Sequence, residues 1–119
     1  MNKNLKSLLA IVTVIIMAAC TNQEQELQKL ISKIENDVKP LRKEACIAQW
    51  DGSISGKSED FDRYAQLSQQ MTEYYSNKEI FNQLKGFKEG GKINDPILKR
   101  QLDILYNAFL SNQADTALL

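Results

Sequence analysis

The sequence has no histidine, the side chain most often used as a general base and as a metal ligand. These 119 residues therefore contain no HExxH zinc motif, no Ser-His-Asp triad and no Cys-His pair. A mechanism built on carboxylates alone stays open, but no pair of Asp or Glu side chains is singled out by its neighbours. We predict that this chain alone carries no catalytic residue, no metal site and no cofactor site.

The sequence also has few cysteines and no excess of positive or negative charge. Cys20 and Cys46 are the only cysteines, so no disulfide framework follows, and Cys46 has no partner in the chain if Cys20 is modified. Basic and acidic residues balance at 15 each, and they are interspersed along the chain. Because nucleic-acid binding requires a positive patch against the phosphates, the sequence predicts no nucleic-acid partner.

A hydrophobic run of membrane-spanning length is missing, but a shorter one lies near the N-terminus. Lys3 and Lys6 precede the apolar segment 8–19, which only Thr13 interrupts. Even counted from Leu5, this run is shorter than the ~20 residues that a spanning helix needs. A basic start, a short apolar centre and small residues before a cysteine form the three-part layout of an export signal. The sequence predicts a cleaved signal peptide over residues 1–19.

The tetrad Met17-Ala18-Ala19-Cys20 resembles a lipobox, the site at which lipoprotein signal peptidase cuts and the cysteine becomes diacylated, although Leu is commoner than Met at its first position. The resemblance implies lipid attachment, such as palmitate, at Cys20 and anchoring to a bacterial cell-envelope membrane, periplasmic or surface-exposed. Two or more acyl chains give stable anchoring. A plain cleaved signal with an incidental cysteine and an uncleaved amphitropic anchor are the two alternatives. Residues 20–26 would form a polar tether.

The helical region, expected over residues 27–112, shows helical periodicity and no convincing strand alternation. We predict an all-α fold of four amphipathic helices arranged as antiparallel hairpins, at about 24–50, 58–75, 77–87 and 96–111. The first helix carries one apolar stripe, interrupted by Pro40, which predicts a kink or a break near Lys39. Asp51-Gly52-Ser53 is expected to end it. The expected N-caps are Ser58, Ser76 and Asp95, the last followed by Pro96.

Three kinds of residue could have a functional role, but each has a simpler structural explanation. Trp50 is expected to anchor a helix end, with ligand stacking as the alternative. Cys46 lies close to the apolar stripe and is expected to be a small buried hydrophobe, because no base or positive neighbour can be placed beside it. The four tyrosines are expected in the core or at its rim: Tyr64, Tyr74, Tyr75 and Tyr106.

Residues 113–119 close on two leucines without a cap or a polar tail. We interpret this segment as a truncated continuation of a longer protein, the alternative being an ordinary small protein with an apolar tip.

Three segments follow one another in order along the predicted helices: Glu44–Asp51 (EACIAQWD), Asp60–Ala65 (DFDRYA) and Asn94–Leu102 (NDPILKRQL). Through their order and spacing, residues 27–112 resemble the N-terminal helical region of angiotensin-converting-enzyme-like zinc peptidases and the related oligopeptidase-F-like enzymes. The resemblance implies a helical lid beside a deep cleft that admits short unfolded peptides. It also implies zinc and an HExxH helix in a C-terminal catalytic domain, none of which lies in this chain.

Two hypotheses of function follow. In the first, the chain is the N-terminal, lid-like part of a lipid-anchored zinc peptidase of the cell envelope. Its partners would then be the membrane, reached through Cys20, and a missing catalytic domain. In the second, the chain is a complete small helical lipoprotein that acts as a binding or structural module.

Overall fold

The computed structural model describes the backbone of residues 3–113 and the side chains of residues 22–113. Within the described backbone the chain forms four helices and no strand, which confirms the all-α prediction. The helices are α1 (Lys3–Ser55), α2 (Ser58–Tyr75), α3 (Lys78–Gly90) and α4 (Pro96–Leu110).

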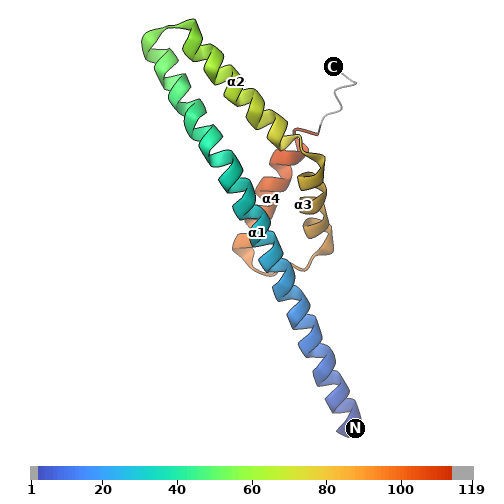
Figure 1. Ribbon diagram of the computed structural model, residues 1–119. Helices are drawn as coiled ribbons and strands as arrows, with labels where there is room; N and C mark the ends of the chain where they lie inside the picture. Colours follow the sequence, from blue (N-terminus) through green and yellow to red (C-terminus); the bar gives the residue numbers. More distant parts are fainter. Residues whose placement is uncertain (1–2, 114–119) are drawn as a thin grey trace.

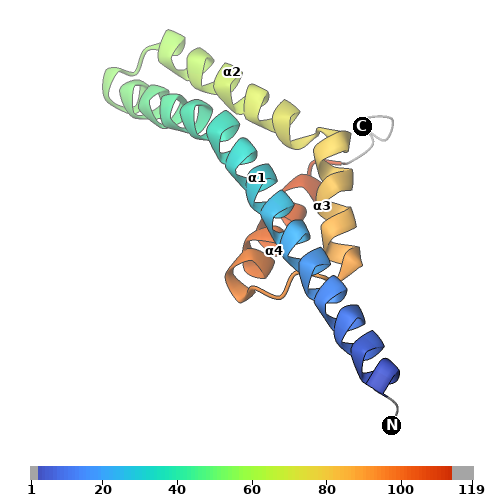
Figure 2. The ribbon, with the colours of Figure 1, turned by 60° about the horizontal axis from the view of Figure 1, so that its bottom comes forward.

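The molecule is elongated, with principal extents of 80 × 32 × 17 Å, because α1 runs through most of its length (Figure 1). α2 returns along the C-terminal third of α1, and this hairpin forms what we call the arm. α3 continues in the direction of α2, and α4 runs back beside α1; with the middle of α1 they form what we call the base (Figure 2). The expected antiparallel hairpins are therefore α1 with α2 and α3 with α4.

The base encloses the larger of two hydrophobic clusters. Leu27, Leu84 and Phe109 come from three different helices and have no exposed surface. Burying a large apolar side chain stabilises the fold by ~1.5–3 kcal/mol, so each of these residues makes a large contribution to the packing energy of the base. The complete cluster is Leu27, Leu30, Ile31, Ile34, Val38, Ile80, Leu84, Ile93, Leu98, Leu102 and Phe109.

Polar contacts fix the register of the helices around this cluster. At the start of α4, Oδ1 of Asp95 accepts hydrogen bonds from the amides of Ile97 (2.8 Å) and Leu98 (2.9 Å), which confirms the expected N-cap. Oε1 of Glu24 accepts from the amides of Asn94 (2.7 Å) and Asp95 (3.0 Å). A side chain within the expected tether therefore holds the α3–α4 connection against α1.

Two of the expected N-caps are wrong. α3 is capped by Asn77, whose Oδ1 accepts from the amide of Ile80 at 3.0 Å, whereas Ser76 is the C-cap of α2. The hydroxyl of Ser76 instead donates to the carbonyl of Thr72 at 2.8 Å, so it cannot serve the next helix. Lys57 stands at the N-cap position of α2 and Ser58 is already helical.

Of the kink or break expected near Lys39, the break is absent, since α1 continues through Pro40 to Ser55. Pro40 removes the hydrogen bond to the carbonyl of Asn36, but both residues are exposed, so water can bond that carbonyl. The expected stop at Asp51-Gly52-Ser53 lies inside the helix as well. α1 ends before Gly56, whose positive φ of 65° begins the turn into α2.

The arm packs through small side chains. Its buried residues are Ala45 and Ala48 of α1 and Leu67 of α2, with Leu41, Tyr64 and Met71 partly buried beside them. Near the tip, Gly52 lies so close to the ring of Phe61 that a Cβ added there would stand 3.1 Å from it. The arm is therefore a thin two-helix layer that leaves much of α1 uncovered.

The expected boundaries at residues 1–19, 20–26 and 27–112 stay predictions. The backbone of α1 is helical on both sides of residue 20, while the side chain of Cys20 lies outside the described side chains. The expected continuation over 113–119 falls, after residue 113, outside the described residues.

Candidate functional site: an apolar groove between α1 and α4

A groove of ≈ 700 Å³ lies between α1 and α4, and we call it the α1–α4 groove. Its floor is apolar and comes from both helices, with Ile34 and Val38 on α1 facing Leu105 and Ala108 on α4. The remaining lining residues are Glu35, Lys39, Arg42, Lys43, Cys46, Tyr75 and Ile104.

The rim of the groove is mainly basic. Lys39, Arg42 and Lys43 line it together with a single carboxylate, Glu35. Arg42 donates a hydrogen bond of 3.4 Å to the hydroxyl of Tyr75, which itself lines the groove. Within residues 22–113, no carboxylate lies within ion-pair distance of these three cations. The rim therefore offers positive charge that the described residues leave uncompensated.

Helix α4 also carries large apolar side chains that are exposed outside the core. Ile104 lines the groove and is 57% exposed, while Ile97, two turns earlier on α4, is 69% exposed. Residues seven positions apart lie on the same face of a helix, but Arg100 and Gln101 lie between them on that face, so the two isoleucines are separate exposed apolar positions.

The arm carries a second exposed apolar surface on α1, on the side that faces away from the groove floor. Each step of four residues from Arg42 through Cys46 to Trp50 and Ile54 turns ~40° around the helix, so this row leads away from Ile34 and Val38. Trp50 is 67% and Ile54 is 70% exposed, and Ile47 beside them is also exposed. We call Ile47, Trp50 and Ile54 the apolar strip. Large contiguous apolar surfaces on soluble proteins mark sites of interaction.

The structure corrects two expectations here. Trp50 does not anchor the end of α1, because α2 packs on the opposite, alanine-bearing side of that helix. Cys46 is a free, exposed thiol that lines the groove and is not a buried hydrophobe. Position in the sequence put both near the apolar stripe, but they lie to one side of it. The tyrosines are partly buried at the edges of the two clusters, as expected.

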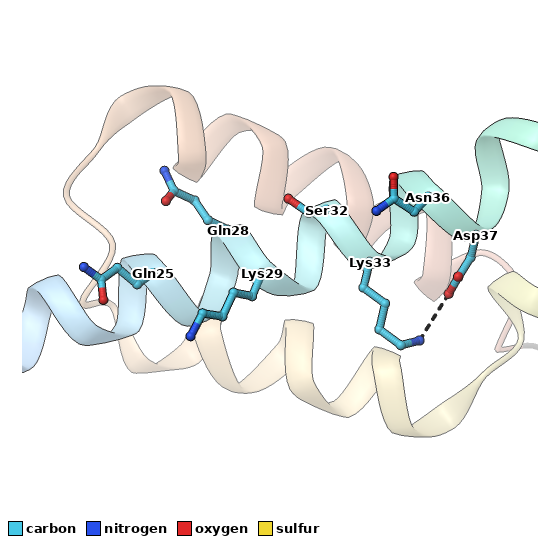
Figure 3. A pocket seen from close by; sticks show the side chains of 7 residues that line it. All are labelled: Gln25, Gln28, Lys29, Ser32, Lys33, Asn36 and Asp37. Atoms are coloured by element: carbon cyan, nitrogen blue, oxygen red, sulfur yellow. Dashed lines mark hydrogen bonds and ion pairs between the residues drawn. The ribbon is translucent and has the colours of Figure 1, made fainter.

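A second concave surface of ≈ 590 Å³ lies on the outer side of α1 and is lined by polar and charged residues (Figure 3). All seven residues that line it belong to this one helix, so no second element encloses it. Nζ of Lys33 stands 3.2 Å from Oδ2 of Asp37, and the hydroxyl of Tyr74 donates to the same oxygen at 2.8 Å. This surface is a solvated helix face whose one notable contact fastens α2 to α1.

That contact changes the protonation of both partners. The hydrogen bond from Tyr74, followed by the neighbouring Lys33, holds the pKa of Asp37 below its ordinary value of 3.8. Burial, followed by the hydrogen bond to Asp37, raises the pKa of Tyr74 above its ordinary value of 10.0. The pair is therefore a protonated phenol that donates to an ionised carboxylate over the whole neutral range.

Sequence reasoning missed the groove, although its signal was present. Lys39 and Lys43 are one helical turn apart, immediately beside Val38 of the apolar stripe, and Arg42 lies between them. The sequence pattern could not reveal that α4 lies along this side of α1 and supplies the second apolar side of the groove. Among the described residues, no group of three or more His, Cys, Asp or Glu side chains could hold a metal ion.

Within the described part of the chain, no helix has a segment long and apolar enough to span a membrane. Comparison with known proteins finds no family model, no curated protein and no solved structure that matches this chain.

Proposed function

We propose that this chain is the N-terminal, lid-like helical part of a lipid-anchored zinc peptidase of the bacterial cell envelope. The observation that carries the proposal is the exposed apolar surface of the chain, which comprises the α1–α4 groove and, on another side of α1, the apolar strip. Exposed apolar surface of this kind is typical of a face that another part of a protein covers. The resemblance of residues 27–112 to the N-terminal helical region of such peptidases supplies the identity of that other part.

In this proposal, peptide hydrolysis takes place in another part of the protein. The catalytic residues, an HExxH helix and its zinc, would belong to a catalytic part that is not among these 119 residues. In such an enzyme zinc activates water and polarises the scissile carbonyl. The helices described here would restrict the cleft to short unfolded peptides, acting by shape alone.

Lipid attachment at Cys20 remains part of the proposal. Glu24, which is tied to the α3–α4 connection, lies only four residues after Cys20. At 1.5 Å per residue, an uninterrupted helix puts the base about one turn from the anchor and the tip of the arm, at Ile54, ~50 Å from it. This arrangement would hold the lid close to the membrane with the arm directed away from it.

One observation favours the second hypothesis, a small helical lipoprotein that acts as a binding module. The base closes its own core, since Leu27, Leu84 and Phe109 are fully enclosed without any further element. A binding module would use the same groove for a separate partner.

The test of the proposal is to extend the reading frame beyond the codon for Leu119 and to express the protein that it encodes. The expected product contains HExxH, binds about one zinc ion per chain and cleaves fluorogenic peptides, whereas the 119-residue chain does neither. A stop codon directly after Leu119, or a longer protein without zinc-dependent cleavage, would contradict the proposal. For the anchor, Cys20→Ser should abolish incorporation of labelled palmitate, and a variant that still takes up label would refute lipidation at Cys20.

A further inference from the structure

Three helices build the α1–α4 groove. Helix α1 contributes two neighbouring rows of side chains at four-residue spacing, Ile34, Val38, Arg42 and Cys46 in the first and Glu35, Lys39 and Lys43 in the second. Ile34 and Val38 are buried whereas the second row is exposed, so the first row lies deeper. Leu105 and Ala108 of α4 line the groove opposite them, and Tyr75 at the end of α2 adds the third element.

The dimensions of the groove suit a small ligand. Its volume of ≈ 700 Å³ lies within the range of ~300–1,000 Å³ that is usual for small-molecule sites. Helix α1 lines it from Ile34 to Cys46, which at 1.5 Å per residue is ~18 Å. An extended acyl chain of about twelve carbons fits within this length, because each carbon advances the chain by less than one C–C bond of ~1.5 Å.

The floor of the groove favours an acyl chain over a peptide. It consists of aliphatic side chains from α1 and α4, and the lining side chains that carry polar or sulfur atoms are Glu35, Lys39, Arg42, Lys43, Cys46 and Tyr75. A bound peptide would bring backbone N–H and C=O groups that need hydrogen-bond partners, which aliphatic side chains do not provide. An acyl chain has no such groups, so it can lie on the floor without leaving polar atoms unsatisfied.

The rim of the groove favours an anionic head group. Within residues 22–113, Lys39, Arg42 and Lys43 form no ion pair, and Glu35 is the single carboxylate that lines the groove with them. The hydrogen bond from Arg42 to the hydroxyl of Tyr75 holds the guanidinium group at the groove. Because positive charge exceeds negative charge at this rim, electrostatic complementarity favours a ligand whose head is negative.

We propose that the α1–α4 groove binds one fatty acid, a single acyl chain with a carboxylate head. The acyl chain lies on the aliphatic floor between α1 and α4, and the carboxylate meets Lys39, Arg42 and Lys43 at the rim. The inference goes beyond the proposed function and does not rest on it. It is also compatible with a part that covers the groove, because the acyl chain lies below the rim.

The experiment uses the full 119-residue chain with Cys20→Ser, in which Cys46 is the only thiol and lines the groove. The rate of labelling by uncharged N-ethylmaleimide is measured with dodecanoate, dodecyltrimethylammonium or acetate, each below the concentration at which micelles form. Because the readout is Cys46, binding of an amphiphile to the apolar segment 8–19 does not register.

Dodecanoate is expected to slow the labelling of Cys46 about tenfold. Dodecyltrimethylammonium has the same apolar chain with the opposite charge, and acetate has the head group alone, so neither should slow it. Equal protection by dodecanoate and the ammonium compound would show that apolar contact alone governs binding and would overturn the proposal. Absence of protection by dodecanoate would overturn it as well.

Charge reversal tests the rim, with protection measured in each variant as the ratio of labelling rates without and with dodecanoate. Lys39→Glu/Lys43→Glu should abolish the protection of Cys46. The control Lys29→Glu/Lys92→Glu makes the same change in net charge away from the groove and should keep it. Undiminished protection in the first variant, with helical circular dichroism intact, would overturn the proposal.

A third variant tests the floor. Ala108→Glu places a carboxylate in the groove and should abolish protection by dodecanoate, whereas Asn107→Glu, next to it on α4 but outside the lining of the groove, should retain it. Undiminished protection in the Ala108→Glu variant would overturn the proposed position of the acyl chain.

Two further results would assign the groove to another occupant and overturn the fatty acid. One is protection of Cys46 by a short apolar peptide with a free carboxylate but not by dodecanoate. The other is concentration-dependent dimerisation that protects Cys46 without any ligand. Failure of the proposed function is judged separately, by the zinc content and peptide cleavage of the longer protein.

Discussion

The base and the arm share the helix α1 but use it differently. In the base, large aliphatic side chains of α1 meet two further helices, and the buried cluster has eleven residues: Leu27, Leu30, Ile31, Ile34, Val38, Ile80, Leu84, Ile93, Leu98, Leu102 and Phe109. In the arm, α1 offers Ala45 and Ala48 to a single helix. The small residues permit close approach but bury little area. The comparison teaches that the base holds the fold together, while the arm presents surface.

The largest expected effect is Phe109→Ala, which empties the centre of the base. Truncating a fully buried phenylalanine costs about 3–5 kcal/mol, comparable to the total stability of a small domain. We expect the variant to lose cooperative unfolding in urea. The neighbouring Leu110→Ala, at a largely exposed position, should change the unfolding free energy by less than about 1 kcal/mol. Equal effects of the two substitutions would mean that the base is not the stable region.

The corresponding change in the arm is Leu67→Ala, expected to cost about 2 kcal/mol because a two-helix interface can close around the missing side chain. Hydrogen exchange should then accelerate at amides of α2 and the C-terminal third of α1, while α3 and α4 keep their protection. Equal acceleration in α3 and α4 would show that arm and base unfold as one unit.

Two glycines sharpen the comparison further. Gly86→Ala in α3 adds a Cβ in open space and should stabilise the protein by about 0.5–1 kcal/mol through helix propensity. Gly52→Ala in the arm brings the Cβ to 3.1 Å from the ring of Phe61. Displacing that ring should offset the same gain, leaving a change near zero. Thermal unfolding of both variants checks this, and an equal rise in midpoint would show that the contact at the tip imposes no constraint.

The smallest expected effect is on pH dependence, where the arm joins the base. Because the folded pKa of Asp37 is lowered from 3.8, its contribution to stability is present above that pH and is lost as pH falls through the folded pKa. Because the pKa of Tyr74 is raised above 10.0, its contribution is present below pH 10 and is lost as pH rises through the folded pKa. The stability difference between the wild-type chain and Asp37→Asn should therefore be constant near neutral pH and shrink below about pH 4. A stability difference between the two proteins that grows on acidification would contradict the predicted direction of the pH dependence.

The sequence predicts the fold better than it predicts the site. Helical periodicity and the Asp95-Pro96 start are local signals, so the four helices and most of the core residues follow from them. The persistence of α1 through Pro40 depends on solvent access to one carbonyl, which no local pattern encodes. The groove depends on where α4 lies relative to α1. Cys46 was therefore expected to be buried and Trp50 to anchor a helix end, although both are exposed.

The most direct test of the central claim, that a catalytic part covers the α1–α4 groove, is the labelling rate of Cys46 in two contexts. The thiol is exposed in the chain described here. In the longer protein that we propose, with Cys20→Ser in both, labelling should be at least about tenfold slower, equivalent to 1.4 kcal/mol of protection. Equal rates in the two proteins would show that the groove stays open and would contradict the account.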